Sequence, residues 1–412
     1  MRTELDASTS TVMDAGEARW RAGANRQAQP DAASHQQAAS RAAAAKRKAT
    51  TMSGEEKYDI SATMVTFELA HECFDDLHDG KAVLLAESDE PLFHEAGVWM
   101  PSTQEWLITS NRLLQGSEDT HVKISAISLS GKVRPLPHLS KQVLMANGGT
   151  TDFAGGAYLC SQGLGHQSGS LWHIDKEMQV ATRIGPPTAL TLNSLNDCVV
   201  HKKSHEIIFT DPAYGLEAQG FRSSYNETKA VWSVHPDHAS EASDWVPVAQ
   251  CASQPNGVLL SPDEHTAYVT DVWAAEWHRG TVKLKKPFRC EKMGGEAEVA
   301  CILAYDVSLN AGGRVVLSGG RKFVDLRTEG ASGYPDGIKC DEQGNVYAGC
   351  GGGVRVYSPA GTFLGQISID GGVSNLCFGG ADGKALLMLN ETRAFIATMK
   401  CRGALHEADL LT

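Results

Sequence analysis

The stretch PNGVLLSPDEHTAYVTD, residues 255–271, joins a polar pair to a short apolar run, a turn and a second apolar run. Residues 335–350, PDGIKCDEQGNVYAGC, repeat this order, and four other stretches follow it more loosely. These four begin at His94 (HEAGVWMPSTQEWLITS), Thr151 (TDFAGGAYLC), Asn196 (NDCVVHKKSHEIIFTD) and Ser374 (SNLCFGGADGKALLMLNET). Repetition at this scale is typical of a radial array of small sheets.

Each repeat carries an oxygen-bearing side chain at or near its start: Glu95, Asp152, Asn196, Asn256, Asp336 and Asn375, at intervals of 57, 44, 60, 80 and 39 residues. A four-stranded blade needs about 40–45 residues, so the longer intervals predict inserted loops, the largest between Asp271 and Ala300. Six repeats predict an all-β fold, a six-bladed β-propeller, with a pair of β-sandwiches as the alternative. The run at 385–400 is expected to pair with the N-terminal strand and close the ring.

Residues 1–52 differ from the rest, because they are rich in Ala, Gln, Ser and Arg and nearly lack large apolar residues. Such a segment cannot offset its ordering entropy by burial. We therefore predict a disordered extension over 1–52, followed by a propeller domain over 53–412. A transit peptide is the alternative, although four acidic residues count against it, and a natural start at Met52 is another.

The formal net charge of -12 argues against nucleic acid as a partner, because phosphate binding needs clustered basic residues. No apolar run approaches the ~20 residues that cross a bilayer, and no signal peptide pattern is present. The ten cysteines form no CxxC pair, and several lie inside apolar runs, which is typical of reduced, buried thiols. These features predict a cytosolic protein without a membrane partner.

The repeats also suggest a site. Asn256 and Asp336 stand in the same local frame, Pro-polar-Gly-apolar, and Glu95 and Asn196 lead two other repeats. Their oxygens are hard ligands that suit Ca²⁺, Mg²⁺ or Mn²⁺. No His/Cys set has the spacing of a thiolate zinc site, and no GxSxG or P-loop motif occurs. The isolated histidines His94, His201 and His205 are interpreted as hydrogen-bonded surface or rim residues.

From roughly Leu84 to Met399 the chain resembles the SMP-30/gluconolactonase/LRE-like family. The resemblance is specific at NSLNDCVVHKKSHEIIFTDPAYGLEAQGFR, at PNGVLLSPDEHTAYVTD and at PDGIKCDEQGNVYAGCGGGVRVYSPAGTFLG, and the stretch from Ser374 resembles the last blade of fungal-type lactonohydrolases. It implies a six-bladed propeller with one divalent cation in the central channel and hydrolysis of a lactone. Ca²⁺ is the favoured cation, with Mg²⁺, Mn²⁺ or Zn²⁺ as alternatives.

The resemblance also implies roles for individual residues. The implied metal ligands are Glu95, Asn196, Asn256 and Asp336. Asp336 is also implied as the proton acceptor, and Asn196 as a contact to metal or substrate. Beyond the resemblance, we hypothesise that Asp197 is the alternative proton acceptor, and that Asp211 and Tyr214 lie at the rim of the channel and shape substrate access as substrate-binding residues. The partner is then a small-molecule lactone. The alternatives are a propeller that binds without turnover and a hydrolase of another ester class, because a fold alone does not decide function.

Two features depart from the family pattern. Ser194 stands where animal members carry an arginine, two residues before the asparagine of the ND motif, which weakens the expectation of animal-type sugar-lactone recognition. The first repeat reads HEAGVW instead of EGPVW, a change directly beside Glu95.

Overall fold

The computed structural model describes residues 65–405, apart from 117–118, 224–225, 227, 250–253, 272–274, 279–280, 285–287, 291–294, 298–299, 327–330 and 332; over 275–297 only the backbone is described. The predicted disordered extension, residues 1–52, lies outside the described residues, and the division of the chain at residue 52 stays a prediction. Within the described part, no helix is long and apolar enough to cross a membrane.

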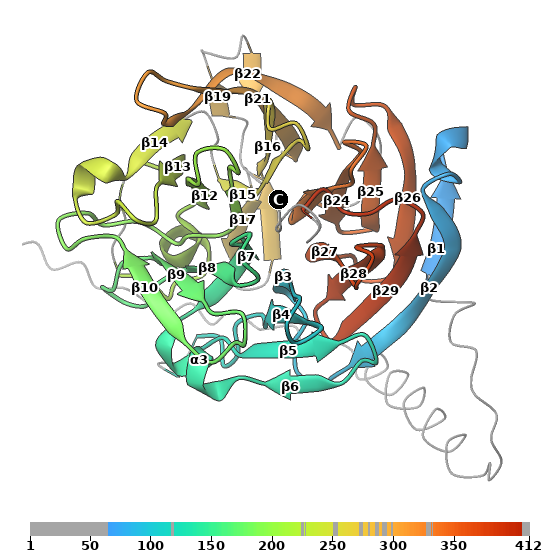
Figure 1. The fold of residues 1–412 in the computed structure, drawn as a ribbon, viewed down its shortest axis with the longest axis horizontal. Helices are drawn as coiled ribbons and strands as arrows, with labels where there is room; N and C mark the ends of the chain where they lie inside the picture. The colour runs from blue at the N-terminus through green and yellow to red at the C-terminus, as the bar shows by residue number, and fades with distance from the viewer. Residues whose placement is uncertain are drawn as a thin grey trace, which may run out of the picture. The chain divides into compact units, whose positions relative to one another are not determined.

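Six sheets follow one another along the chain and surround a central axis, as Figure 1 shows. The predicted six-bladed β-propeller is therefore confirmed. Each blade is antiparallel, and its strands follow one another from the axis outward, except that β1 and β2 supply the outermost strands of the last two blades. From the axis outward, the first blade contains β3 Glu95–Met100, β4 Glu105–Thr109, β5 Ile124–Ser128 and β6 Val133–Pro135. The second blade contains β7 Ala146–Thr151, β8 Ala157–Ser161, β9 Ser170–Ile174 and β10 Ala181–Gly185. The third blade contains β11 Cys198–Val200, β12 Ile207–Asp211, β13 Ala230–Val234 and β14 Val246–Ala249.

The last three blades contain both the insertion and the closure. The fourth blade contains β15 Pro255–Leu260, β16 Thr266–Asp271, β21 Cys301–Leu309 and β22 Val315–Asp325. The fifth blade contains β23 Ile338–Cys340, β24 Val346–Cys350, β25 Gly353–Tyr357, β26 Phe363–Ile369 and β1 Val65–Leu69. The sixth blade contains β27 Asn375–Gly379, β28 Ala385–Asn390, β29 Arg393–Met399 and β2 His78–Glu87. The predicted insertion after Asp271 forms two hairpins, β17 Ala275–His278 with β18 Thr281–Leu284 and β19 Phe288–Cys290 with β20 Gly295–Ala297.

The N-terminal part of the propeller closes the ring, as the sequence predicted. Strand β2 pairs antiparallel with β29, so the first and last parts of the described chain share one blade. Strand β1 adds a fifth strand to the preceding blade by pairing with β26, which the sequence did not indicate. Because each outer strand comes from the far end of the chain, opening either blade requires breaking contacts across the whole sequence.

The core is divided among the blade interfaces. Six buried apolar clusters are found in the described residues, and each lies between two successive blades. Alternate residues of an inner strand serve opposite interfaces: Val258 and Leu260 of β15 face the preceding blade, while Leu259 faces the following one. Inner strands buried on both faces read as continuous apolar runs, which is why the pattern was visible in the sequence.

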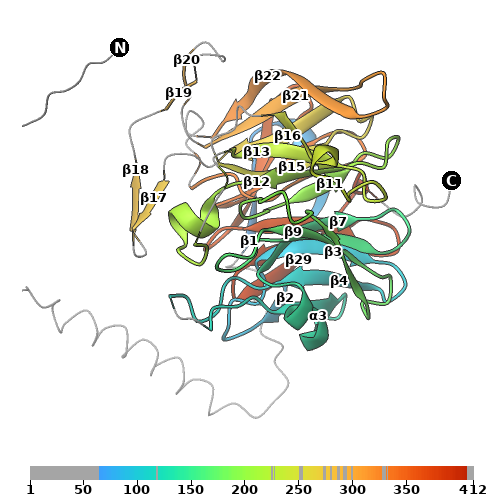
Figure 2. The same cartoon turned by 90° about the vertical axis from the view of Figure 1, so that its left-hand side faces the viewer.

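Helical elements are short and lie in connections. Among the residues that the structure describes, they are η1 Glu72–Phe74, α3 Pro137–Gln142, the π-helix η2 Tyr214–Ala218 and η3 Ala242–Asp244. Of these, η2 matters for the site, because it carries Tyr214 beside the channel and its neighbour in space is the inserted strand β17. Figure 2 shows the blades from the side, with the inserted hairpins β17–β18 and β19–β20 at one end of the propeller.

Candidate functional site

A closed ring of hydrogen bonds ties the inner strands together at one end of the channel. In each blade, a threonine, serine or glycine donates to a backbone oxygen of the next blade. The six bonds run from Thr109 Oγ1 to Asn147 O (3.1 Å), Gly148 N to Asn196 O (2.8 Å), Thr210 Oγ1 to Asn256 O (2.5 Å), Thr270 Oγ1 to Asp336 O (2.8 Å), Gly337 N to Ser374 O (2.8 Å) and Ser374 Oγ to His94 O (2.7 Å).

This ring defines which residues are equivalent in the six blades. The residues at or beside the ring positions are Glu95, Asn147, Asn196, Asn256, Asp336 and Asn375. Asp152 was predicted as the second of these, and that prediction was wrong: Asp152 follows the end of β7 and pairs with His173 at 2.7 Å. The Asn-Gly pair at 147–148, which matches Asn256-Gly257, was the signal that could have identified the correct residue.

Close approach of neighbouring inner strands explains the glycine that follows Asn256. A Cβ atom at Gly257 would lie 2.6 Å from the carbonyl oxygen of Asp336. Two residues that bear metal-capable oxygens, Asn256 and Asp336, are thereby brought onto adjacent strands at the same level. The Pro-polar-Gly frame noted in the sequence therefore reflects a packing requirement.

Glu95 is aimed into the channel by an irregularity in β3. Ala96 (φ 65°) and Gly97 (φ 70°) both have left-handed backbones, and the register with β4 shifts between Ala96 and Val98. A bulge of this kind re-aims the side chain beside it. Glu95 is 2 % exposed, and its Oε2 accepts a hydrogen bond of 2.6 Å from Asn375 Nδ2. Burial and the nearby Asp336 carboxylate hold the pKa of Glu95 well above its usual range.

Asp336 stands just before β23 and is half-buried. Burial raises its pKa to about 6, against the opposing effects of His94 and of a hydrogen bond with the Asn256 side chain. The phenol of Tyr214, from η2, also faces Asn256, and its hydroxyl donates to Gln254 O at 3.4 Å. Glu95, Asn256, Asp336 and Tyr214 therefore share one neighbourhood.

Asn196 and Asp197 occupy different positions although they are adjacent. The backbone of Asn196 belongs to the ring, and its Oδ1 atom is buried without a hydrogen-bond partner among the described residues. Asp197 is 1 % exposed, accepts from Cys198 N at 2.9 Å and lies 3.6 Å from Lys339 Nζ. Asp197 therefore lies deeper in the channel than Asn196, and its carboxylate is already paired with Lys339. Sequence reasoning did not identify Lys339.

Asp211 is not brought to the rim with Tyr214. Its side chain is 0 % exposed, and its Oδ2 accepts a 2.9 Å hydrogen bond from Asn193 N. Burial raises the pKa of Asp211 to about 7, although the hydrogen bond from Asn193 and the charge of Arg222 oppose the shift. In this structure Asp211 supports the backbone that leads to Asn196.

His94 lies beside Glu95 and is held by Glu391, with 2.7 Å between Nδ1 and Oε1. Burial lowers the pKa of His94, but the charge of Glu391 and this hydrogen bond outweigh burial and raise the pKa to about 9. The expectation of a hydrogen-bonded histidine at the rim thus fits its geometry. Its partner, 297 residues away, could not have been read from local sequence.

The donor set fits a hard divalent cation. The Oδ1 atoms of Asn196 and Asn256 are buried without a described partner, and the Asp336 carboxylate raises the pKa of Glu95. A cation between them would satisfy the amide oxygens and offset the effect of the Asp336 charge on Glu95. Among the described residues no three His, Cys, Asp or Glu are grouped as in a metal site, because two of the four donors here are amides.

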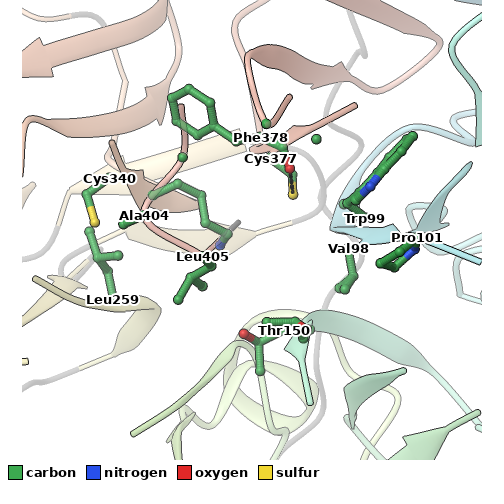
Figure 3. Close-up of a pocket in the computed structure, with 17 residues that line it drawn as sticks. Val98, Trp99, Pro101, Thr150, Leu259, Cys340, Cys377, Phe378, Ala404 and Leu405 are labelled. Carbon is green, nitrogen blue, oxygen red and sulfur yellow. Dashed lines mark hydrogen bonds between the residues drawn. The ribbon is translucent and has the colours of Figure 1, made fainter. Parts of the chain in front are cut away.

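The channel changes character along its length. Beyond the polar ring, the inner strands line an apolar pocket, shown in Figure 3, and Lys339 borders it. The labelled side chains come from five blades and from the segment after β29: Val98, Trp99, Pro101, Thr150, Leu259, Cys340, Cys377, Phe378, Ala404 and Leu405. The polar group and this pocket occupy opposite ends of the same strands, with the Asp197–Lys339 pair between them.

The chain is similar to several known proteins. Residues 296–391 match the SMP-30/Gluconolactonase/LRE-like region. A gluconolactonase of Zymomonas mobilis is 29% identical over 232 residues, covering 51% of this chain and 55% of that protein. The lactonohydrolase oryL of Aspergillus oryzae is 27% identical over 304 residues, covering 72% and 65%. The chain thus spans between about half and two thirds of the length of these relatives, and the resemblance predicted from its motifs is confirmed.

Solved structures share the fold. A gluconolactonase from Xanthomonas campestris superposes with a TM-score of 0.62 and 21% identity, covering 85% of this chain and 99% of that one. Regucalcin from Agrobacterium tumefaciens, described as a calcium-binding protein, gives a TM-score of 0.51 and 17% identity, covering 77% and 96%. At these identities the likeness establishes the propeller and not the chemistry.

Proposed function

We propose that this protein hydrolyses a lactone with the help of one divalent cation, held by Glu95, Asn196, Asn256 and Asp336. The observation that carries the proposal is the placement of two carboxylates and two unpartnered amide oxygens at the same end of four inner strands. Lactone hydrolysis is the activity in the names of both sequence relatives. Ca²⁺ is the favoured ion because every donor is an uncharged or anionic oxygen.

When bound, such a cation polarises the lactone carbonyl and lowers the pKa of water. The protein's own residues would supply orientation and a proton acceptor. Asp336 is half-buried and faces the channel, so its carboxylate can meet a water molecule, whereas Asp197 is enclosed and paired with Lys339. Of the two carboxylates predicted as the base, this geometry favours Asp336. Asn196 and Tyr214 would contact the substrate, and Asp211 would act by holding the backbone before Asn196.

The test uses the purified full chain. It is stripped with a chelator and assayed by acid release on hydroxylated, unsubstituted and aromatic lactones, before and after addition of Ca²⁺, Mg²⁺, Mn²⁺ or Zn²⁺. Activity that needs the ion supports the proposal, and turnover that survives complete removal of metal contradicts it. Metal binding without hydrolysis of any lactone would instead favour a binding propeller. Location in the cytosol stays a prediction.

The ligand assignment is tested separately by calorimetry. Glu95→Gln should lose metal binding while keeping its fold, because the variant keeps the side-chain shape but removes one of two carboxylates. Glu105→Gln is the matched control, since Glu105 lies on the neighbouring strand of the same blade and pairs with Arg134 away from the channel. Equal metal affinity in the wild type and in Glu95→Gln would overturn the assignment.

A further inference from the structure

The imidazole of His94 is held in place by two residues from different blades. Glu391, in the turn between β28 and β29, lies 2.7 Å from Nδ1 through its Oε1 atom. The second oxygen of Glu391 accepts a 3.0 Å hydrogen bond from Asn111 Nδ2, just after β4. Both oxygens of the carboxylate are therefore engaged, and the ring cannot turn without losing this contact.

The backbone of Glu391 suggests that this arrangement has a function. Glu391 has φ 59°, in the left-handed region that two-residue hairpin turns usually fill with Asn, Asp or Gly. A longer side chain is unfavourable there, and such strained residues concentrate at functional sites. At this position the Glu391 side chain reaches back across the blade interface to His94.

The free edge of the imidazole lies near the proposed metal ligands. With Nδ1 occupied, Nε2 is the nitrogen that remains for another partner, and none of the described residues hydrogen-bonds to it. The His94 side chain is 21% exposed, and the ring interacts electrostatically with both Glu95 and Asp336. A ligand bound at those carboxylates would therefore meet a ring nitrogen that is fixed and accessible.

We propose that His94 is a specificity-determining residue whose Nε2 hydrogen-bonds a hydroxyl substituent of the lactone, with Glu391 and Asn111 as positioning residues. A hydroxyl group both donates and accepts, so this contact forms with either protonation state of the ring. The inference rests on the proposed function. It assigns recognition of a hydroxyl to the interface between the last blade and the first.

A purely structural role is the competing explanation, because the same segment helps to close the ring. Ser374 Oγ donates to His94 O, and Phe93 N donates to Glu391 O at 2.8 Å. Both bonds use the backbone of the His94 segment or of Glu391, so they survive replacement of the imidazole. Loss of the ring should thus change recognition more than it changes the fold.

The experiment compares kcat/KM for D-glucono-δ-lactone with that for δ-valerolactone, which lacks the hydroxyls. In His94→Phe the ratio should fall about tenfold or more, the usual effect of losing one strong polar contact. Glu391→Gln should lower the ratio in the same direction, and the double variant should lose little more, because Glu391 acts through His94. His173→Phe is the matched control. His173 lies on β9, away from the inner strands of the channel, and forms an equivalent 2.7 Å pair with Asp152.

Two results would overturn the inference. One is a folded His94→Phe protein whose ratio stays within about twofold of the wild type. The other is additive loss in the double variant, which would show that Glu391 does not act through His94. If the wild type hydrolyses no lactone, the proposed function fails on its own. Calorimetric binding of D-gluconate against 5-hydroxypentanoate then decides the inference, and equal relative affinities in wild type and His94→Phe would refute it.

Discussion

Replacing Gly257 by alanine should damage the site and the fold together. A Cβ atom there would lie 2.6 Å from Asp336 O and 3.0 Å from Ile338 Cγ2. Since a carbon–oxygen contact normally needs about 3.4 Å, strands β15 and β23 would have to separate by ~0.8 Å. The same Asp336 oxygen accepts the 2.8 Å ring bond from Thr270, which this separation would stretch.

The expected cost is that of overpacking a rigid core, about 1–3 kcal/mol. With an unfolding entropy of ~2.1 cal/mol/K per residue over roughly 340 residues, this corresponds to a fall in Tm of about 1.5–4 °C. The shift also moves Asn256 away from Asp336, and misplacement of this kind typically costs about 10–100-fold in metal affinity.

Scanning calorimetry and calcium titration measure the two effects. Gly312→Ala is the control, because the nearest atom to its added Cβ is an exposed Asn310 side-chain oxygen at 3.3 Å. If Gly257→Ala melts and binds calcium like the wild type, the inner strands are free to separate, and the close packing inferred for the ring is refuted.

Three further predictions concern stability. Burial raises the pKa of Asp211 from 3.8 to about 7, so the folded state binds this proton more tightly and the contribution of Asp211 to stability should fall as pH rises from about 4 to 7, by up to about 4 kcal/mol. Asp211→Asn should remove this contribution and reduce the slope of stability against pH in urea titrations, while Glu95 and Asp336 keep theirs. Thr270→Val leaves the buried Gly257 N and Asp336 O without their shared partner, and we expect a loss of about 1–3 kcal/mol by urea unfolding, with no loss contradicting the ring. Calcium at about 100 times its Kd should stabilise the protein by about 2.7 kcal/mol, measurable as a higher Tm that a chelator reverses and that Glu95→Gln lacks.

Local sequence was sufficient to identify a candidate site residue where the motif around that residue repeats along the chain. Asn256 and Asp336 were found because each stands between a proline and a glycine that the close inner strands require. Asn147 was missed because the preceding segment lacks the proline, so the second repeat was aligned on Asp152 instead. Closure by β2 on β29 followed from the need to remove exposed sheet edges, whereas β1 on β26 left no such signal.

The amino-acid sequence by itself determined the blades, because an inner strand that is buried on both faces requires a short continuous apolar run, which is visible in the sequence. It also placed Glu95, Asn196, Asn256 and Asp336 at or near the starts of four inner strands, although it missed Asn147. Only the tertiary structure decided what surrounds them: that Lys339 engages Asp197, that Asp211 is enclosed, and that Glu391 fixes His94. The Lys339–Asp197 and Glu391–His94 pairs join residues 142 and 297 positions apart on different blades, so the packing of the blades into a ring, and not a local sequence pattern, brings them into contact.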